Sequence, residues 1–210
     1  MKKIKNYIHG KIVCNSKKEQ SVFDPSKGEE IAKVVLSDEN DFINVIESSK
    51  KSQAEWSKTT PLKRSRIISK YKTLIENNLQ ELAELVSKEH GKTLEDAKGS
   101  VTRGLEVVEF ACGIPHLLKG EFSQNVGTNI DSWSVRQPLG ICGGITPFNF
   151  PAMVPMWMYP ISIACGNSFI LKPSEKDPSC GIKLAELFSE AGLPDGVFNV
   201  INGDKDVVNM

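Results

Sequence analysis

Hydrophobic positions recur at helical spacing through most of residues 38–112. Four helices are predicted there: one capped by Asp38 or Ser37 and ending near Trp56, one starting at Thr60–Pro61, one ending at Gly91, and one starting at Thr93. The fourth has the clearest apolar face, which comprises Leu94, Ala97, Val101, Leu105, Val108 and Cys112. Before the helices, the pattern predicts short strands on either side of turns at His9–Gly10 and Asp24–Pro25.

The period of the pattern changes between residues 122 and 138. Trp133 and Val135 alternate with Ser132 and Ser134, as in a strand that has one polar face. A half-exposed ribbon of this kind often pairs with another subunit. The pattern therefore predicts a β-ribbon that serves as an oligomerisation segment over residues 122–138.

After Pro138, apolar strands alternate with helices. LGICGGI, NSFILKP and GVFNVING are predicted strands, and AMVPMWMYPISIACG and PSCGIKLAELFSEAG are the helices between them. Strands that are apolar on both faces and alternate with helices indicate a parallel sheet covered on both sides. Such sheets bind ligands at the carboxyl ends of their strands. The predicted fold class is therefore α/β, with a parallel Rossmann-like sheet flanked by helices.

Composition and charge limit the kinds of binding partner that the chain can have. The chain has 26 basic and 26 acidic side chains among 210 residues, so no net charge steers it to nucleic acid or anionic lipid. Residues 137–171 carry no charge, but prolines interrupt the run, which favours a buried strand–helix unit over a membrane span. Five cysteines without a Cys-x-x-Cys pair, and an N-terminus without an apolar segment, predict reduced thiols, a cytoplasmic location and no metal site.

The stretch GICGGITPFNFP places Asn149 between Pro147 and Pro151, just past a predicted strand end. An amide in so stiff a turn could keep its NH2 aimed at a developing oxyanion without reorganising during reaction. The alternative is an asparagine that caps a helix starting near Pro151. Residue types alone leave both interpretations open.

Longer motifs resemble a known family. TPFNFP, FILKPSEKDP and EAGLPDGVFNVINGD resemble the first half of NAD-dependent aldehyde dehydrogenases. TRGLEVVEFACGIPHLLKGE, together with PFNFPAMVPMWMYPISIACGN, is similar to the CoA-acylating branch that acts on methylmalonate semialdehyde. The resemblance covers essentially the whole chain. It implies NAD as cofactor, coenzyme A as co-substrate, a small acid semialdehyde as substrate, and a homotetramer built as a dimer of dimers, with no nucleic acid or membrane partner.

The resemblance also implies roles for residues near the first strand end. Asn149 would stabilise the oxyanion formed when a cysteine thiolate adds to the aldehyde. Thr146 and Phe148 would line the path of the cofactor near its nicotinamide. Loop packing is the alternative for these two.

At the next strand end, the resemblance implies that Lys172 and Glu175 hold hydroxyls of the adenosine ribose, and that Lys176 touches the adenine side. The Glu175 carboxylate would accept from the ribose 2′-hydroxyl and repel a 2′-phosphate, so NAD should be preferred to NADP. A solvated Lys–Glu pair at a helix start is the alternative.

The resemblance also implies that Arg103 binds the substrate carboxylate, because a guanidinium can hold a planar carboxylate through two hydrogen bonds. Glu106 stands three residues further on, so a surface ion pair along the helix is the alternative. The three histidines share no metal-ligand spacing.

The chain also departs from the family. Aldehyde dehydrogenases are more than twice as long, and none of the five cysteines stands in the Gly-Gln-x-Cys setting of the nucleophile. The expected parts are an N-terminal helical region with leading strands (1–121), the ribbon (122–138), and an incomplete βαβαβ portion of the NAD-binding domain (139–210). Alone, the chain is expected to be inactive. A hydrolytic aldehyde dehydrogenase, and a non-catalytic NAD-binding or oligomerisation module, are the rival functions.

Overall fold

A five-stranded sheet runs through the computed structural model, which describes residues 2–210. Its strand order is β3 (Lys11–Val13), β2 (Asn6–Ile8), β10 (Phe198–Val200), β9 (Ser168–Lys172) and β8 (Ile141–Ile145). The last three strands are parallel, as predicted. The β2–β3 hairpin adds two antiparallel strands, and its turn has positive φ at His9 and Gly10 (52° and 71°). The two ends of the sequence thus share one sheet.

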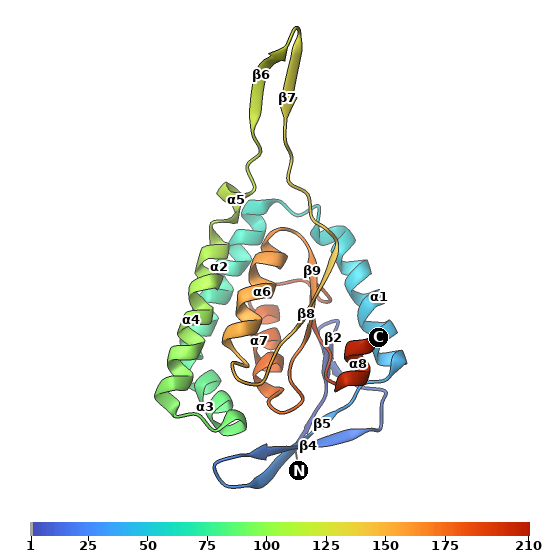
Figure 1. Ribbon diagram of the computed structural model, residues 1–210, viewed down its shortest axis with the longest axis vertical. Coiled ribbons are helices and arrows are strands. Elements are labelled where there is room, and N and C mark those ends of the chain that lie inside the picture. The colour runs from blue at the N-terminus through green and yellow to red at the C-terminus, as the bar shows by residue number, and fades with distance from the viewer. Residues whose placement is uncertain (1) are drawn as a thin grey trace.

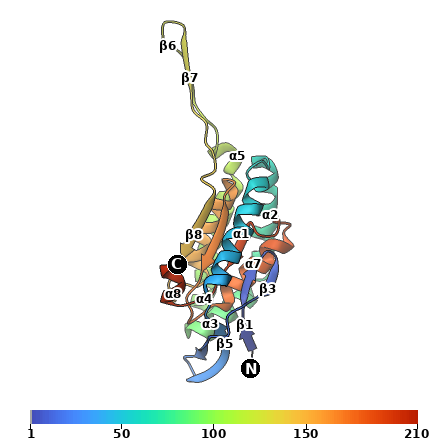
Figure 2. The same ribbon diagram turned by 90° about the vertical axis from the view of Figure 1, so that its right-hand side faces the viewer.

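Helices cover this sheet in layers (Figures 1 and 2). Helix α1 (Glu39–Trp56) contacts one face, while α6 (Met153–Ala164) and α7 (Ser179–Glu190) lie on the other. Outside them lie α2 (Pro61–Asn77), α3 (Leu79–His90) and α4 (Leu94–Cys112). The predicted helix ends are confirmed: Asp38, Thr60 and Thr93 cap α1, α2 and α4 with their side chains, and Gly91 ends α3 in the left-handed region.

Aromatic side chains join the layers. The ring of Tyr71 on α2 stacks on Phe188 of α7 with centroids 4.0 Å apart, and Tyr159 of α6 stacks on Phe198 of β10 at 4.3 Å. The two tyrosine hydroxyls lie 2.5 Å apart, so each buried polar group has a partner. This cluster fixes α2, α6 and α7 against the sheet.

The expectation that both faces of the sheet are covered holds for β9, which is buried along its length, but is wrong for β8. Ile141 and Ile145 are 38% and 58% exposed. The reason is that β8 is the edge strand, and a cleft of about 470 Å³ separates that face from α1 and from α8 (Lys205–Asn209).

The predicted ribbon forms from β6 (Phe122–Gly127) and β7 (Ile130–Trp133) and projects far from the body (Figures 1 and 2). Both strands are exposed within this chain, including Phe122 and Trp133, so the cover for one face, which the sequence assigns to another subunit, stays a prediction. A ribbon so far from the body has no surface of its own chain to pack on.

The remaining elements complete the body. A separate three-stranded sheet contains β1 (Lys2–Ile4), β5 (Glu29–Val35) and β4 (Glu19–Asp24), and a short helix α5 (Ile114–Leu117) precedes the ribbon. In the part of the chain that the structure describes, no helix has both the length and the apolar character needed to cross a bilayer.

Close packing of α4 on α6 depends on Gly104. A Cβ at this position would lie 3.0 Å from Met156 Cβ and 3.2 Å from the backbone of Met153. We expect Gly104→Ala to lower the free energy of unfolding by about 1–3 kcal/mol, because α6 must move. Gly99→Ala on the same helix meets nothing within 4 Å and should stabilise by about 0.5–1 kcal/mol. Chemical unfolding of both variants measures this, and a stabilised Gly104→Ala would contradict the packing argument.

Candidate active site

The carboxyl ends of β8 and β9 meet at one edge of the sheet. Ile145 pairs with Lys172 in the parallel register, and the Thr146 N–H donates to the Lys172 carbonyl oxygen at 3.1 Å. Gly144 leaves space for the Phe169 ring beside this pairing, since a Cβ there would lie 2.5 Å from the ring. The register therefore brings the Asn149 turn next to Lys172, as the sequence predicted for this edge.

The turn after β8 leaves the Asn149 amide unengaged. Helix α6 begins at Met153, its N-cap is Ala152, and no side chain caps it, so the helix-cap interpretation of Asn149 is wrong. Asn149 is exposed, and within residues 2–210 its only hydrogen bond is one that its backbone oxygen accepts from Lys92. The NH2 group can therefore serve a substrate oxygen.

Thr146 starts the same turn and is buried. Its hydroxyl oxygen has no hydrogen-bond partner in the described part of the chain. A buried hydroxyl without a partner is costly unless a ligand or water satisfies it.

Lys172 and Glu175 form an ion pair of 3.0 Å beside the cleft under β8. The pair is not freely solvated, because the side chains are only 10% and 27% exposed. Burial opposes ionisation of Glu175, but hydrogen bonds from the backbone and from Lys172 outweigh it and hold the pKa of the carboxyl below its usual value. Glu175 thus presents a negative charge next to Lys172, which lines the cleft.

Phe148 and Lys176 meet on the other side of the turn. The Lys176 ammonium lies 4.4 Å from the centroid of the Phe148 ring, and the His90 ring stacks on Phe148 at 6.5 Å. Burial, and then the nearby Lys92, lower the pKa of His90. These side chains line a second cavity of about 610 Å³, which β4 closes on its far side.

Two carboxyl groups lie behind Lys176 in the wall of that cavity. Glu89 accepts from the Ser179 N–H at 3.0 Å, whereas neither oxygen of Asp177 has a partner within residues 2–210. Burial, and then the Glu89 carboxylate, raise the pKa of Asp177 to about 8, and burial also raises the pKa of Glu89. Asp177 therefore keeps its proton to a higher pH than an exposed aspartate does.

Arg103 stands apart from the other predicted site residues. Its side chain is exposed on α4, and within residues 2–210 it forms no ion pair with Glu106 or any other carboxylate. The next residue, Gly104, packs on Met153 at the start of α6, shortly after the Asn149 turn. Arg103 is thus unpaired on the helix that flanks that turn.

Sequence reasoning missed Lys92, Glu89 and Asp177. Lys92 stands between the helix stop at Gly91 and the helix cap at Thr93, a connection that places it beside the turn. The position of Lys92 between two helix-end residues could have indicated that its backbone is fixed. Nothing local marks Glu89 or Asp177, because their environment comes from the packing of α3 against α7.

The five cysteines are free thiols. Burial raises the pKa of Cys112, Cys165 and Cys180, the last far above the physiological range. These three thiols are therefore poor nucleophiles where they stand. In the described part of the chain, no three His, Cys, Asp or Glu side chains are arranged to hold a metal ion.

Asp177 should make stability depend on pH. Its folded pKa of about 8 lies above the value of 3.8 for a free aspartate, so the folded state binds more protons between these values and stability falls as pH rises through that window. Raising the pH from 5 to 8 should therefore increase the free energy of unfolding of Asp177→Asn, relative to that of the wild type, by up to about 3 kcal/mol. Denaturant unfolding at both pH values measures it, with the exposed Glu106→Gln as control. A pH-independent difference would contradict the assignment.

The sequence of this chain is similar to those of known semialdehyde dehydrogenases. Over 202 residues the chain is 54% identical to a malonate-semialdehyde dehydrogenase of Pseudomonas aeruginosa, covering 96% of this chain and 41% of that protein. It is 48% identical to a Dictyostelium discoideum protein named as a probable methylmalonate-semialdehyde/malonate-semialdehyde dehydrogenase of the acylating type, covering 98% and 39%. The chain thus spans about two fifths of the length of these relatives.

Solved structures agree in fold. A crystal structure from Sinorhizobium meliloti, named as a methylmalonate-semialdehyde dehydrogenase and complexed with NAD, matches with a TM-score of 0.98 and 52% identity over all of this chain and 43% of that one. A methylmalonate-semialdehyde dehydrogenase from Oceanimonas doudoroffii matches with a TM-score of 0.98, 49% identity and the same coverage. The family model described as "Aldehyde dehydrogenase family" matches residues 12–210. The chain belongs to the aldehyde dehydrogenase family.

Proposed function

We propose that this chain is the N-terminal part of an enzyme that uses NAD to oxidise malonate or methylmalonate semialdehyde to an acyl-CoA, with loss of carbon dioxide. The observation that carries the proposal is the meeting of the Asn149 turn with Lys172 and Glu175 at one sheet edge. The names of the relatives support the substrate class.

The residues at this edge fit a dinucleotide. Lys172 and the ionised Glu175 offer a donor and an acceptor to ribose hydroxyls, and the buried Thr146 hydroxyl lacks a partner that a bound cofactor could supply. Phe148 adds a half-exposed aromatic face beside the turn. NAD, when bound, would accept the hydride that leaves the aldehyde carbon.

Asn149 acts on the oxygen of the substrate. In the proposed reaction, a cysteine thiolate from outside this chain adds to the aldehyde carbon, and the carbonyl electron pair moves to the oxygen. The Asn149 NH2 donates a hydrogen bond to that oxygen, and its turn is held before reaction by two prolines. Burial keeps Cys112, Cys165 and Cys180 protonated, which supports a nucleophile placed elsewhere.

Arg103 provides the link to an acid semialdehyde. It is a guanidinium without a carboxylate partner, on the helix beside the site, and so can donate two hydrogen bonds to a substrate carboxylate. Loss of the hydride would leave a thioester on the cysteine. The thiol of coenzyme A would displace the cysteine thiolate from it, and the substrate carboxylate would leave as carbon dioxide while the carbon that carried it takes up a proton.

The exposed ribbon supports self-association. Its apolar side chains, Phe122, Val126, Ile130 and Trp133, are all more than half exposed. Apolar strands that project into water are typical of surfaces that pair with another subunit. The second candidate function, a non-catalytic oligomerisation module, would use the same ribbon without the site. A hydrolytic dehydrogenase would use the site without coenzyme A.

Glu175→Ser in the full-length enzyme tests the cofactor assignment. Removing the carboxylate deletes an acceptor for the 2′-hydroxyl and a charge that repels a 2′-phosphate. The ratio of kcat/KM for NAD to that for NADP should fall by about tenfold or more, since such a contact contributes on the order of 1–3 kcal/mol. An unchanged ratio would mean that Glu175 only forms an ion pair with Lys172 and does not contact the cofactor.

Arg103→Leu tests the substrate class. The variant should lose on the order of 2–4 kcal/mol of transition-state stabilisation toward malonate semialdehyde and little toward propanal. Arg103→Lys should recover part of the loss, because an ammonium lacks the planar fork. Arg66→Leu, an exposed arginine on α2, is the control. Equal losses for the two aldehydes would leave a generic aldehyde dehydrogenase.

A further inference from the structure

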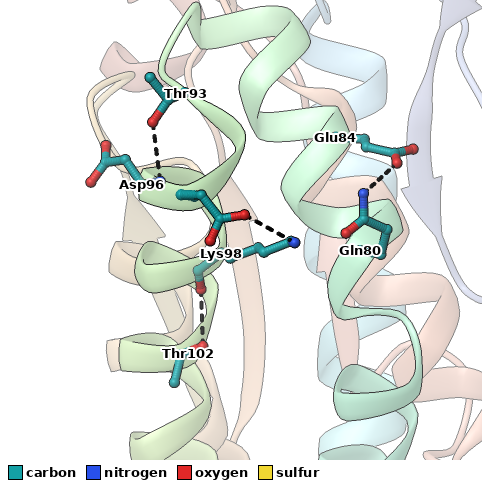
Figure 3. A network of polar contacts seen from close by, with 7 residues as sticks. Gln80, Glu84, Thr93, Asp96, Lys98 and Thr102 are labelled. Atoms are coloured by element: carbon teal, nitrogen blue, oxygen red, sulfur yellow. Dashed lines mark hydrogen bonds and ion pairs between the residues drawn. The ribbon is translucent and has the colours of Figure 1, made fainter.

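Lys92 occupies the short connection between α3 and α4. Gly91 ends α3 with a φ of 87°, and the Thr93 hydroxyl accepts from the Asp96 N–H at the start of α4 (Figure 3). These two signals fix the backbone on both sides of Lys92. Its side chain is only 8% exposed, which is unusual for a lysine and calls for partners.

The Lys92 ammonium has three partners. It donates to the backbone oxygen of Asn149 at 3.2 Å, forms an ion pair with Asp96 at 3.4 Å, and lies 4.4 Å from the centroid of the Phe150 ring. Asp96 is half exposed, so its charge is satisfied in part by solvent. The lysine therefore bridges α4 to the Asn149 turn.

Few other contacts hold that turn. Pro147 and Pro151 have no N–H, the Thr146 N–H bonds back to β9, and the Phe150 oxygen accepts from Val154 in the first turn of α6. Among residues 2–210, the Lys92 contact is the only hydrogen bond made by Asn149. It uses the backbone oxygen and so leaves the side-chain NH2 available.

We propose that Lys92 is a positioning residue that holds the Asn149 turn so that the amide of Asn149 points at the substrate oxygen. The inference rests on the proposed oxyanion role of Asn149. Lys92 contacts neither substrate nor cofactor in this account and acts only through Asn149. Catalysis by a fixed donor depends on its alignment before reaction, so loosening the turn should slow the chemical step more than it weakens cofactor binding.

A double-mutant cycle in the full-length enzyme tests this coupling. Lys92→Met keeps the apolar stem and removes the ammonium, and should lower kcat by about tenfold with the KM for NAD changed less than about twofold. Asn149→Ala should lower kcat by about 100-fold. Because Lys92 acts through Asn149, the double variant should be within about threefold of Asn149→Ala alone. Losses that multiply to about 1,000-fold would overturn the positioning role and leave the oxyanion role of Asn149 intact.

Unchanged turnover in Asn149→Ala would overturn both the oxyanion role and the positioning role. Lys92→Arg should recover part of kcat, since a cation can still reach the Asn149 carbonyl. Lys98→Met is the matched control: Lys98 lies on α4, pairs with Glu95 at 3.2 Å (Figure 3), and its removal should leave kcat unchanged.

If Lys92→Met does not fold, Asp96→Asn provides a milder variant, because it removes only the ion partner of Lys92. It should lower kcat by about threefold, and this loss should vanish in the Asn149→Ala background. A loss that persists there would overturn the proposal.

Discussion

The parallel register of β8 on β9 determines which candidate residues meet at the sheet edge. It sets Ile145 opposite Lys172, so the turn that carries Asn149 and the loop that carries Glu175 leave the sheet at the same edge. Gly144 leaves room on the face of this sheet, because a Cβ there would collide with the Phe169 ring and the Met158 side chain. Shifting the register by one residue would send each side chain of β8 to the opposite face.

Charged groups around this edge are held by partners of different kinds. Lys172 pairs with a carboxylate, Lys176 lies over an aromatic ring, and Lys92 combines a carboxylate, a ring and a backbone carbonyl. Lys172 and Lys92 are largely buried and gain their partners inside the fold, whereas the exposed Lys176 keeps contact with water. The polar groups are thus fixed by the fold itself, which is what a binding site for a charged cofactor requires.

Local signals predicted much of this structure. Helix ends at Asp38, Thr60, Gly91 and Thr93 could be read from the sequence because capping depends on neighbours within one turn. The motifs around Asn149 and Lys172 indicated the correct sheet edge for the same reason: strand ends can be located from hydrophobic runs. The exposure of β8 could not be predicted, since burial depends on which elements lie opposite. Lys92 and Asp177 escaped notice because Asn149, which Lys92 contacts, and Glu89, which lies in the same cavity wall as Asp177, are distant in sequence.

A crystal structure of the full-length enzyme with NAD and a substrate-derived adduct on its nucleophilic cysteine tests the central claim most directly. The account predicts ribose hydroxyls within hydrogen-bond distance of Lys172 Nζ and the Glu175 carboxylate, and the Asn149 NH2 donating to the oxygen of the adduct. A nucleotide bound away from the β8–β9 edge, or an Asn149 amide that is occupied by the protein's own backbone, would contradict it.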